Sequence, residues 1–175
     1  NQLTSLDVSG CTELTRLACN DNQLTSLDVS GCTELTRLWC YANKLSSLNV
    51  AGCTQLEVIS CYCNRLNGSA AELFVESLPT VENCAVYFAY NTDEQNVMTA
   101  DMVSKAIVKN YNIYYYTGEK DEDGYEMWYW YEGVDPALAI TGVEADATND
   151  SAPWFTLSGA QLDKAPTAAG IYIHG

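Results

Sequence analysis

Hydrophobic and polar positions repeat along the first third of the chain with a period of twenty-one residues. The stretch NQLTSLDVSGCTELTRL at residues 1–17 occurs again, letter for letter, at 22–38. A third copy, NKLSSLNVAGCTQLEVI at 43–59, keeps the apolar positions while its polar letters change. Because a unique core would need a different side chain at each place, literal repetition predicts an environment that itself repeats, which is a stack of similar turns.

Each turn contains a short stretch in which buried and exposed positions alternate. Leu17 and Cys19 lie two positions apart, so in an extended strand they point to one side, whereas Ala18 and Asn20 point to the other. We therefore expect a strand with one buried face. The other half of the turn, LDVSGC at 27–32, alternates in the same way and is too short for a helix, so we expect strand-like segments on both sides of the first turns.

An asparagine follows each strand of the repeat. It stands where the chain leaves the strand, and a short amide can there hydrogen-bond backbone groups that have lost their ladder partners. Beyond residue 66 the spacing lengthens to twenty-seven residues, which assigns Asn91 to the same position. The sequence thus predicts a structural ladder inside the stack, made of Asn22, Asn43, Asn64 and Asn91.

The longer period is filled by two segments with helical spacing of apolar residues. They are SAAELFVESL at 69–78 and TADMVSKAIVKN at 99–110, and each begins with Ser or Thr, which suits a helix N-terminus. Strand patterns recur at 86–88 and 113–115. We expect helices on the outer side of these two turns and about five strands in one curved parallel sheet.

The pattern L-x-x-L-x-C-x-x-N-x-L, which runs from Leu14 to Leu24, resembles the repeat motif of the leucine-rich repeat family. This resemblance implies an α/β solenoid with parallel strands on one side. Its outer side would be flat in the first turns and helical in the last two.

The chain changes character after residue 113. YYYTGEKDEDGYEMWYWYEG at 114–133 has two aromatic runs around an acidic, glycine-containing turn, which predicts a hairpin that caps the open end of the stack. Residues 1–133 are therefore expected to form one domain. Residues 134–153 are small, acidic and proline-containing, and we expect a linker that could contain one strand at 139–144.

Residues 154–175 predict a partial β tail of three short strands. Trp154–Gly159 and Gly170–Ile173 resemble the small C-terminal sorting tails of secreted proteins from anaerobic gut and oral bacteria. The tail departs from that pattern at Ala160–Gln161, where basic residues are usual, and at Gly175, where the sequence ends before the closing strand. The resemblance implies a secreted or cell-surface, outer-membrane-associated protein. Residue 1 falls within a turn, so we expect the sequence to be an excerpt or a mature fragment.

The strongly negative net charge excludes some classes of binding partner. The formal charge is −15, with only eight Lys and Arg, which argues against nucleic acid and against anionic membrane surfaces. No run of eighteen apolar residues occurs, so we expect no membrane insertion. The oligomeric state is left open by the sequence.

Most cysteines occupy core positions of the repeat. Cysteine is a small buried hydrophobe in such places, and three in one column would leave one unpaired, so we expect free thiols. A bridge between Cys63 and Cys84 is the alternative for the remaining two. Cys61-x-Cys63 lacks the spacing of a structural zinc site and a nearby histidine. The core positions are Cys11, Cys19, Cys32, Cys40, Cys53 and Cys61.

Side chains for catalysis are scarce. The one histidine, His174, lies near the end of the sequence, and no Ser, Cys or carboxylate sits in a recognisable nucleophile motif. Asp121–Gly124 is similar to part of a calcium loop, but the twelve-residue pattern is absent. Asp7, Asp28 and Asn49 repeat on one flank, where turn capping is the stronger interpretation. We expect no enzyme activity, no cofactor and no metal.

The outward positions of the strands are rich in aromatic residues. Exposed Trp and Tyr in a concave array are what protein and sugar recognition use, so Trp39, Tyr41, Tyr62 and Tyr87 are candidate binding residues. The alternative is that strands favour aromatic residues anyway and that the hairpin packs over the last of them. The expected columns are Ala18, Trp39, Ser60, Tyr87, Tyr114 and Asn20, Tyr41, Tyr62, Ala89, Tyr116.

Arg16 and Arg37 lie one turn apart at the edge of this face and would suit a carboxylate or sulfate on a partner. Alternatively, they are copies of one repeat that pair with Glu13 and Glu34. Together these features predict a secreted or surface adhesion-type module that recognises a protein or a glycan through the exposed face of the sheet. A structural or spacer module of a larger envelope protein, without its own ligand, is the alternative.

Overall fold

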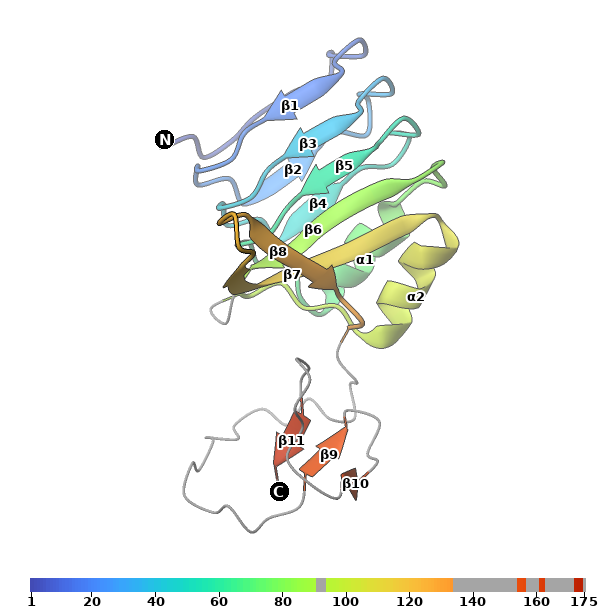
Figure 1. The fold of residues 1–175 in the computed structure, drawn as a ribbon. Coiled ribbons are helices and arrows are strands. Elements are labelled where there is room, and N and C mark those ends of the chain that lie inside the picture. The colour runs from blue at the N-terminus through green and yellow to red at the C-terminus, as the bar shows by residue number, and fades with distance from the viewer. Residues whose placement is uncertain (91–93, 134–153, 157–160, 163–171, 175) are drawn as a thin grey trace. The chain divides into compact units, whose positions relative to one another are not determined.

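A computed structural model describes residues 1–90, 94–133, 154–156, 161–162 and 172–174 (Figure 1). The chain divides into two compact units, Asn1–Gly133 and Val134–Gly175. The expected linker, with its strand at 139–144, lies outside the described residues.

The first unit is built on a mostly parallel sheet, as the spacing of the strand patterns predicted. Its order is β1-β3-β5-β6-β7-β8, and the pairs from β1 to β7 are parallel. β8 pairs with β7 in the antiparallel direction and forms the expected hairpin at one edge. The strands are β1 (Arg16–Ala18), β3 (Arg37–Trp39), β5 (Val58–Ser60), β6 (Cys84–Tyr90), β7 (Tyr111–Lys120) and β8 (Glu126–Trp130).

Successive strands pair without a shift between equivalent positions of the repeat. Leu17 pairs with Leu38, Leu38 with Ile59, and Ile59 with Val86. The inward side chains therefore form continuous columns, and Leu38, Ile59 and Val86 are completely buried. Apolar residues at equivalent positions of the repeat thus pack into equivalent sites of one continuous core.

The second layer is strand-like in the first turns and helical in the later ones. β2 (Ser26–Asp28) and β4 (Ser47–Asn49) form a two-stranded parallel sheet, and α1 (Ser69–Ser77) packs beside β4. Figure 1 shows α2 (Ala100–Val108) next to α1 on the same side of the large sheet. Both helices were predicted, with ends that differ by one or two residues. Thr99 caps α2 through the backbone N–H of Met102, whereas Gly68 rather than Ser69 is the N-cap of α1.

The second unit contains a three-stranded antiparallel sheet. β9 (Trp154–Thr156) lies between β10 (Gln161–Leu162) and β11 (Tyr172–His174). Within the described residues, neither α1 nor α2 is long and apolar enough to cross a membrane.

All eight cysteines are free thiols, so the alternative of a Cys63–Cys84 bridge is wrong for this structure. Cys32 and Cys53 are fully buried, and the Sγ of Cys53 donates to the carbonyl oxygen of Val29 in the preceding turn, at 3.1 Å. Cys11, expected in the same core column, is exposed because it belongs to the first turn, whose outer side no other described turn covers.

Candidate binding face

The asparagines at the ends of the strands form a hydrogen-bonded ladder beside the sheet. The Nδ2 of Asn64 donates to the carbonyl oxygens of Cys61 and Cys40, at 2.9 and 3.0 Å, and its Oδ1 accepts from the N–H of Leu45 at 2.9 Å. Asn22 and Asn43 make equivalent bonds in their own turns. Each amide therefore joins two neighbouring turns through their backbone groups. These bonds fix the position of one turn relative to the next.

Asn91, assigned to this ladder from the sequence, lies outside the described residues. Asn96 makes the corresponding bonds, donating to Cys61 and Phe88 at 2.8 Å and accepting from the N–H of Leu66 at 2.8 Å. A signal for this existed in the sequence, because each ladder asparagine precedes a buried apolar residue by two positions. Asn96 has Met98 there, whereas the segment after Asn91 has only polar letters.

The first outward column runs through the register-matched residues of the strands. Ala18 pairs with Trp39, Trp39 with Ser60, and Ser60 with Tyr87. Trp39 therefore has a small side chain on each side, and it takes part in no aromatic pair within residues 1–90 and 94–133. The expected contiguous patch of Trp39, Tyr41 and Tyr62 thus contains stacked tyrosines with Trp39 beside them.

The second column is a continuous stack of tyrosine rings. Tyr41 lies flat on Tyr62, with ring centroids 4.6 Å apart and planes 9° apart. Tyr62 stacks on Tyr90 at 5.0 Å, and Tyr90 contacts Tyr116 at 4.6 Å. Ala89 was expected in this column and is instead buried, because a register shift between Tyr87 and Ala89 brings Tyr90 into line.

The hairpin covers more of this face than the sequence indicated. Its residue Trp128 lies against Tyr62, Tyr87 and Tyr90, at centroid distances of 5.5, 4.8 and 5.9 Å. The packing expected over Tyr114 and Tyr116 is also present, through Trp130 at 5.0 Å and Trp128 at 5.5 Å. The face is consequently divided into a part under the hairpin and an open part around Trp39 and Tyr41.

Burial and nearby acidic groups raise the pKa of Tyr62 and Tyr90 in the covered part and keep their hydroxyls protonated. Burial, followed by the neighbouring Tyr41 and Glu126, raises the pKa of Tyr62 well above its usual range. Burial also raises the pKa of Tyr90, whose hydroxyl donates to the Oε1 of Glu126 at 3.0 Å. These groups act as neutral donors and packing surfaces at any physiological pH.

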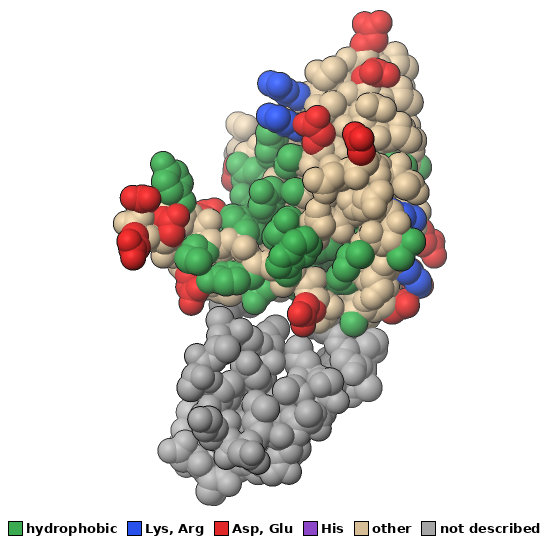
Figure 2. Space-filling model, turned by 45° about the vertical axis from the view of Figure 1, so that its right-hand side comes forward, with side chains coloured by type: hydrophobic (Ala, Val, Ile, Leu, Met, Phe, Trp, Pro, Cys, Tyr) green, Lys and Arg blue, Asp and Glu red, His purple; other side chains and the backbone are tan. Residues whose placement is uncertain are grey.

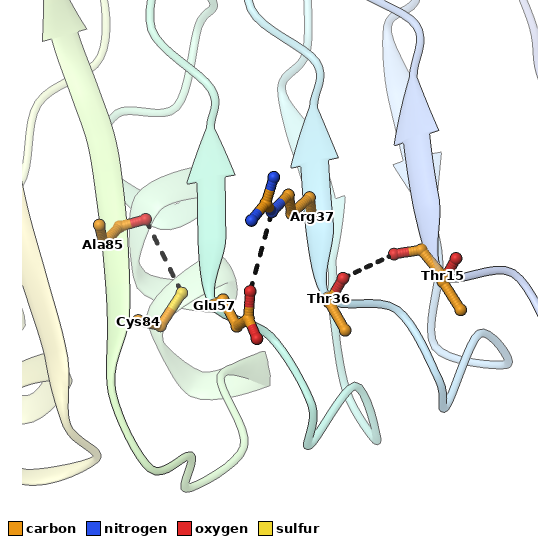
Figure 3. Close-up of polar contacts among 6 residues, drawn as sticks. All are labelled: Thr15, Thr36, Arg37, Glu57, Cys84 and Ala85. Atoms are coloured by element: carbon orange, nitrogen blue, oxygen red, sulfur yellow. Dashed lines mark hydrogen bonds and ion pairs between the residues drawn. The ribbon is translucent and has the colours of Figure 1, made fainter.

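The two candidate arginines occupy paired positions of neighbouring strands. Arg16 pairs in register with Arg37, and the Nε of Arg37 lies 3.7 Å from the Oε2 of Glu57, just before β5 (Figure 3). The alternative pairing with Glu13 and Glu34 is wrong for Arg37. Arg16 makes no ion pair within the described part of the chain.

The chain matches no protein-family model, no curated protein and no solved structure.

Hydrophobic side chains gather on the face seen in Figure 2, with Lys or Arg side chains at its upper edge and Asp and Glu on a projecting segment. A separate polar pocket of about 280 Å³ has Lys44, Cys63, Arg65 and Glu94 in its lining. The carboxylate of Glu94 already accepts from backbone N–H groups, including that of Asn96 at 2.9 Å. This pocket thus serves the backbone of a turn.

Carboxylates elsewhere have structural roles. The Oδ1 of Asp7 accepts from the N–H of Ser9, and that of Asp28 from the N–H of Ser30, each at 2.9 Å. Backbone hydrogen bonds lower the pKa of both carboxyl groups. No group of three or more metal-ligating side chains occurs among the residues for which the structure is described.

Proposed function

We propose that this chain is a secreted or cell-surface binding module of leucine-rich-repeat type, an α/β solenoid that recognises a protein or a glycan through the exposed face of its parallel sheet. The resemblance of the repeat motif to that family supports the fold, and the resemblance of the tail to sorting segments supports the location. The observation that carries the proposed function is the open part of the aromatic face, where Trp39 and Tyr41 are half-exposed beside β1.

Aromatic side chains on a rigid sheet suit recognition because little conformational entropy is lost when they meet a partner. Tyr41 is held in place by its stack on Tyr62. Asn43 of the asparagine ladder ties the turn that carries Trp39 and Tyr41 to the preceding turn, through the carbonyl oxygens of Cys40 and Cys19. The open part is therefore preorganised, which favours a binding role over incidental packing.

A test compares the wild-type chain with Trp39→Ala on arrays of glycans and of purified proteins. We expect at least one ligand whose binding free energy weakens by more than about 1 kcal/mol in Trp39→Ala, as for an aromatic hot spot. Tyr125→Ala is the matched control, because Tyr125 is 73% exposed and lies in the hairpin turn. A ligand that is insensitive to Trp39→Ala, in a variant that melts normally, would place the binding site elsewhere.

A structural or spacer module is the second candidate. The contacts of Trp128 with four tyrosines favour it, because they use most of the aromatic face for intramolecular packing. Absence of ligands on both arrays, with a folded protein, would support this candidate.

A further inference from the structure

The surroundings of Trp39 differ from those of every other aromatic residue on the face. Its register neighbours are Ala18, which is exposed, and Ser60, so neither neighbour covers the indole with a ring of its own. The tyrosines of the adjacent column, by contrast, stack on one another. Trp39 thus presents a flat apolar surface between two small residues.

Arg16 and Arg37 lie two positions before Ala18 and Trp39, on the same side of strands β1 and β3. Parallel strands are about 4.8 Å apart, so two like charges directly opposite each other repel. The contact of Arg37 with Glu57 offsets this weakly, since the two side chains are 42% and 61% exposed. In a chain of net charge −15, this pair is a local concentration of positive charge that an anion would neutralise.

The separation between the arginine pair and Trp39 along the strands indicates the size of a ligand that could contact both. Residues two apart on a strand are separated by about 7 Å along one side of the sheet, so the positions of Arg16 and Arg37 are near enough to that of Trp39 for one pyranose ring and its acidic substituent to reach both. Guanidinium groups bind carboxylate and sulfate through paired N–H donors. The apolar C–H face of a sugar packs on an aromatic ring.

We propose that Arg16, Arg37 and Trp39 form a subsite for an acidic sugar, whose ring stacks on Trp39 and whose carboxylate or sulfate is bound by the arginine guanidinium groups. This subsite rests on the proposed function of the sheet face and names its ligand as a negatively charged glycan. Tyr41, stacked at the next position, extends the surface toward a neighbouring sugar unit.

The form of the open part favours a sugar. Trp39 presents its indole between two small residues, and the hairpin residue Trp128 covers the tyrosines farther along the face. A single flat ring flanked by small side chains suits the C–H face of one sugar unit.

The test is calorimetric titration of the full 175-residue chain with two matched pairs of probes. The first pair is a galacturonic acid trisaccharide and its methyl ester, and the second is a sulfated galactan oligosaccharide and its desulfated form. We expect one acidic probe to bind at least about tenfold more tightly than its neutral counterpart, a difference within reach of one charge-assisted pair. The pair that shows the preference identifies the anion as carboxylate or sulfate.

The double variant Arg16→Gln/Arg37→Gln should remove this preference, and Trp39→Ala should weaken binding of the acidic probe. Lys44→Gln/Arg65→Gln is the control: it removes the same charge from two exposed side chains at equivalent places of successive turns, and it should leave the preference intact. The acidic subsite is overturned by equal binding of acidic and neutral probes, by no binding of either acidic probe, by an equal effect of the control variant, or by a glutamate-rich peptide that binds as tightly. Binding of another ligand that depends on Trp39 but not on the arginines would overturn the subsite alone and leave the proposed function standing.

Discussion

The asparagine ladder makes a quantitative prediction for Asn64→Leu. Asn64 is 3% exposed, so water cannot replace its bonds. The substitution leaves the N–H of the fully buried Leu45 without its acceptor. The carbonyl oxygens of Cys40 and Cys61 lose one donor each and keep another, from Asn43 and Asn96 respectively.

The magnitude follows from these contacts. An orphaned buried donor costs about 1 to 3 kcal/mol, and each lost hydrogen bond to a carbonyl that keeps another donor costs about 0.5 to 1.5 kcal/mol. We therefore expect Asn64→Leu to lower the free energy of unfolding by about 2 to 6 kcal/mol. Urea unfolding followed by circular dichroism measures this as a lower midpoint with an unchanged slope.

Two control variants distinguish the loss of ladder hydrogen bonds from a general cost of replacing asparagine by leucine. Asn20 is half-exposed, and its Nδ2 donates only to the side chain of Asp21, so Asn20→Leu should cost less than about 0.5 kcal/mol. Asn22 bonds Cys19 and the exposed Leu3, so Asn22→Leu should fall between the two. Equal losses in all three variants would refute the assignment of these amides to the ladder.

The remaining predictions concern thiols, glycine and the hairpin. Mass spectrometry of protein alkylated while denatured should find all eight cysteines reduced, and any disulfide would contradict the structure. Burial raises the pKa of Cys19 and Cys53 from 9.0 to about 11. The unfolded chain therefore releases these protons first, and the free energy of unfolding should fall as the pH rises from 9.0 to about 11, less steeply when both are alanine. Gly133→Ala places a Cβ 2.6 Å from backbone atoms at the start of α2 and should lower the melting temperature. Gly124→Ala is the control and should have a smaller effect, because Gly124 also has a positive φ but no atom lies within 4 Å of its added Cβ. Equal effects of the two substitutions would mean that only the backbone conformation matters. Trp128→Ala should cost roughly 1 to 3 kcal/mol because it removes a half-buried indole from the tyrosine stack, and an unchanged urea midpoint would show that the hairpin does not pack there.

The local pattern was sufficient to predict most of the fold. Alternation at Leu17 and Cys19, copied at fixed spacing, predicted the strands and their buried face, and helical spacing predicted α1 and α2 within two residues. These features depend on neighbours that the repeat itself supplies. In-register pairing of equivalent residues in the parallel sheet therefore makes long-range contacts predictable from short-range ones.

Departures from the repeat could not be predicted in the same way. Tyr90 enters the tyrosine column because the strand bulges after Tyr87, and the period alone contains no information about a bulge. Trp128 reaches Tyr62 across two intervening strands, a contact set by how the hairpin folds over the sheet. Asn96 supplies a ladder amide five residues beyond the position that the period assigns, because the longer turn contains extra residues that the period does not place.

Literal repetition also has a consequence for how the chain folds. Segments 1–17 and 22–38 are identical, so the third turn could accept either of them as its neighbour with the same contacts. A chain in which segment 1–17 takes the place of 22–38 would form the same local contacts with the third turn while leaving the skipped turn unpacked, which makes it a kinetic trap. The later turns have no such ambiguity, since α1, α2 and the aromatic hairpin occur once in the first unit. Folding that starts from these unique turns and adds the identical ones in sequence avoids the error, so we expect folding to begin in the C-terminal part of this unit.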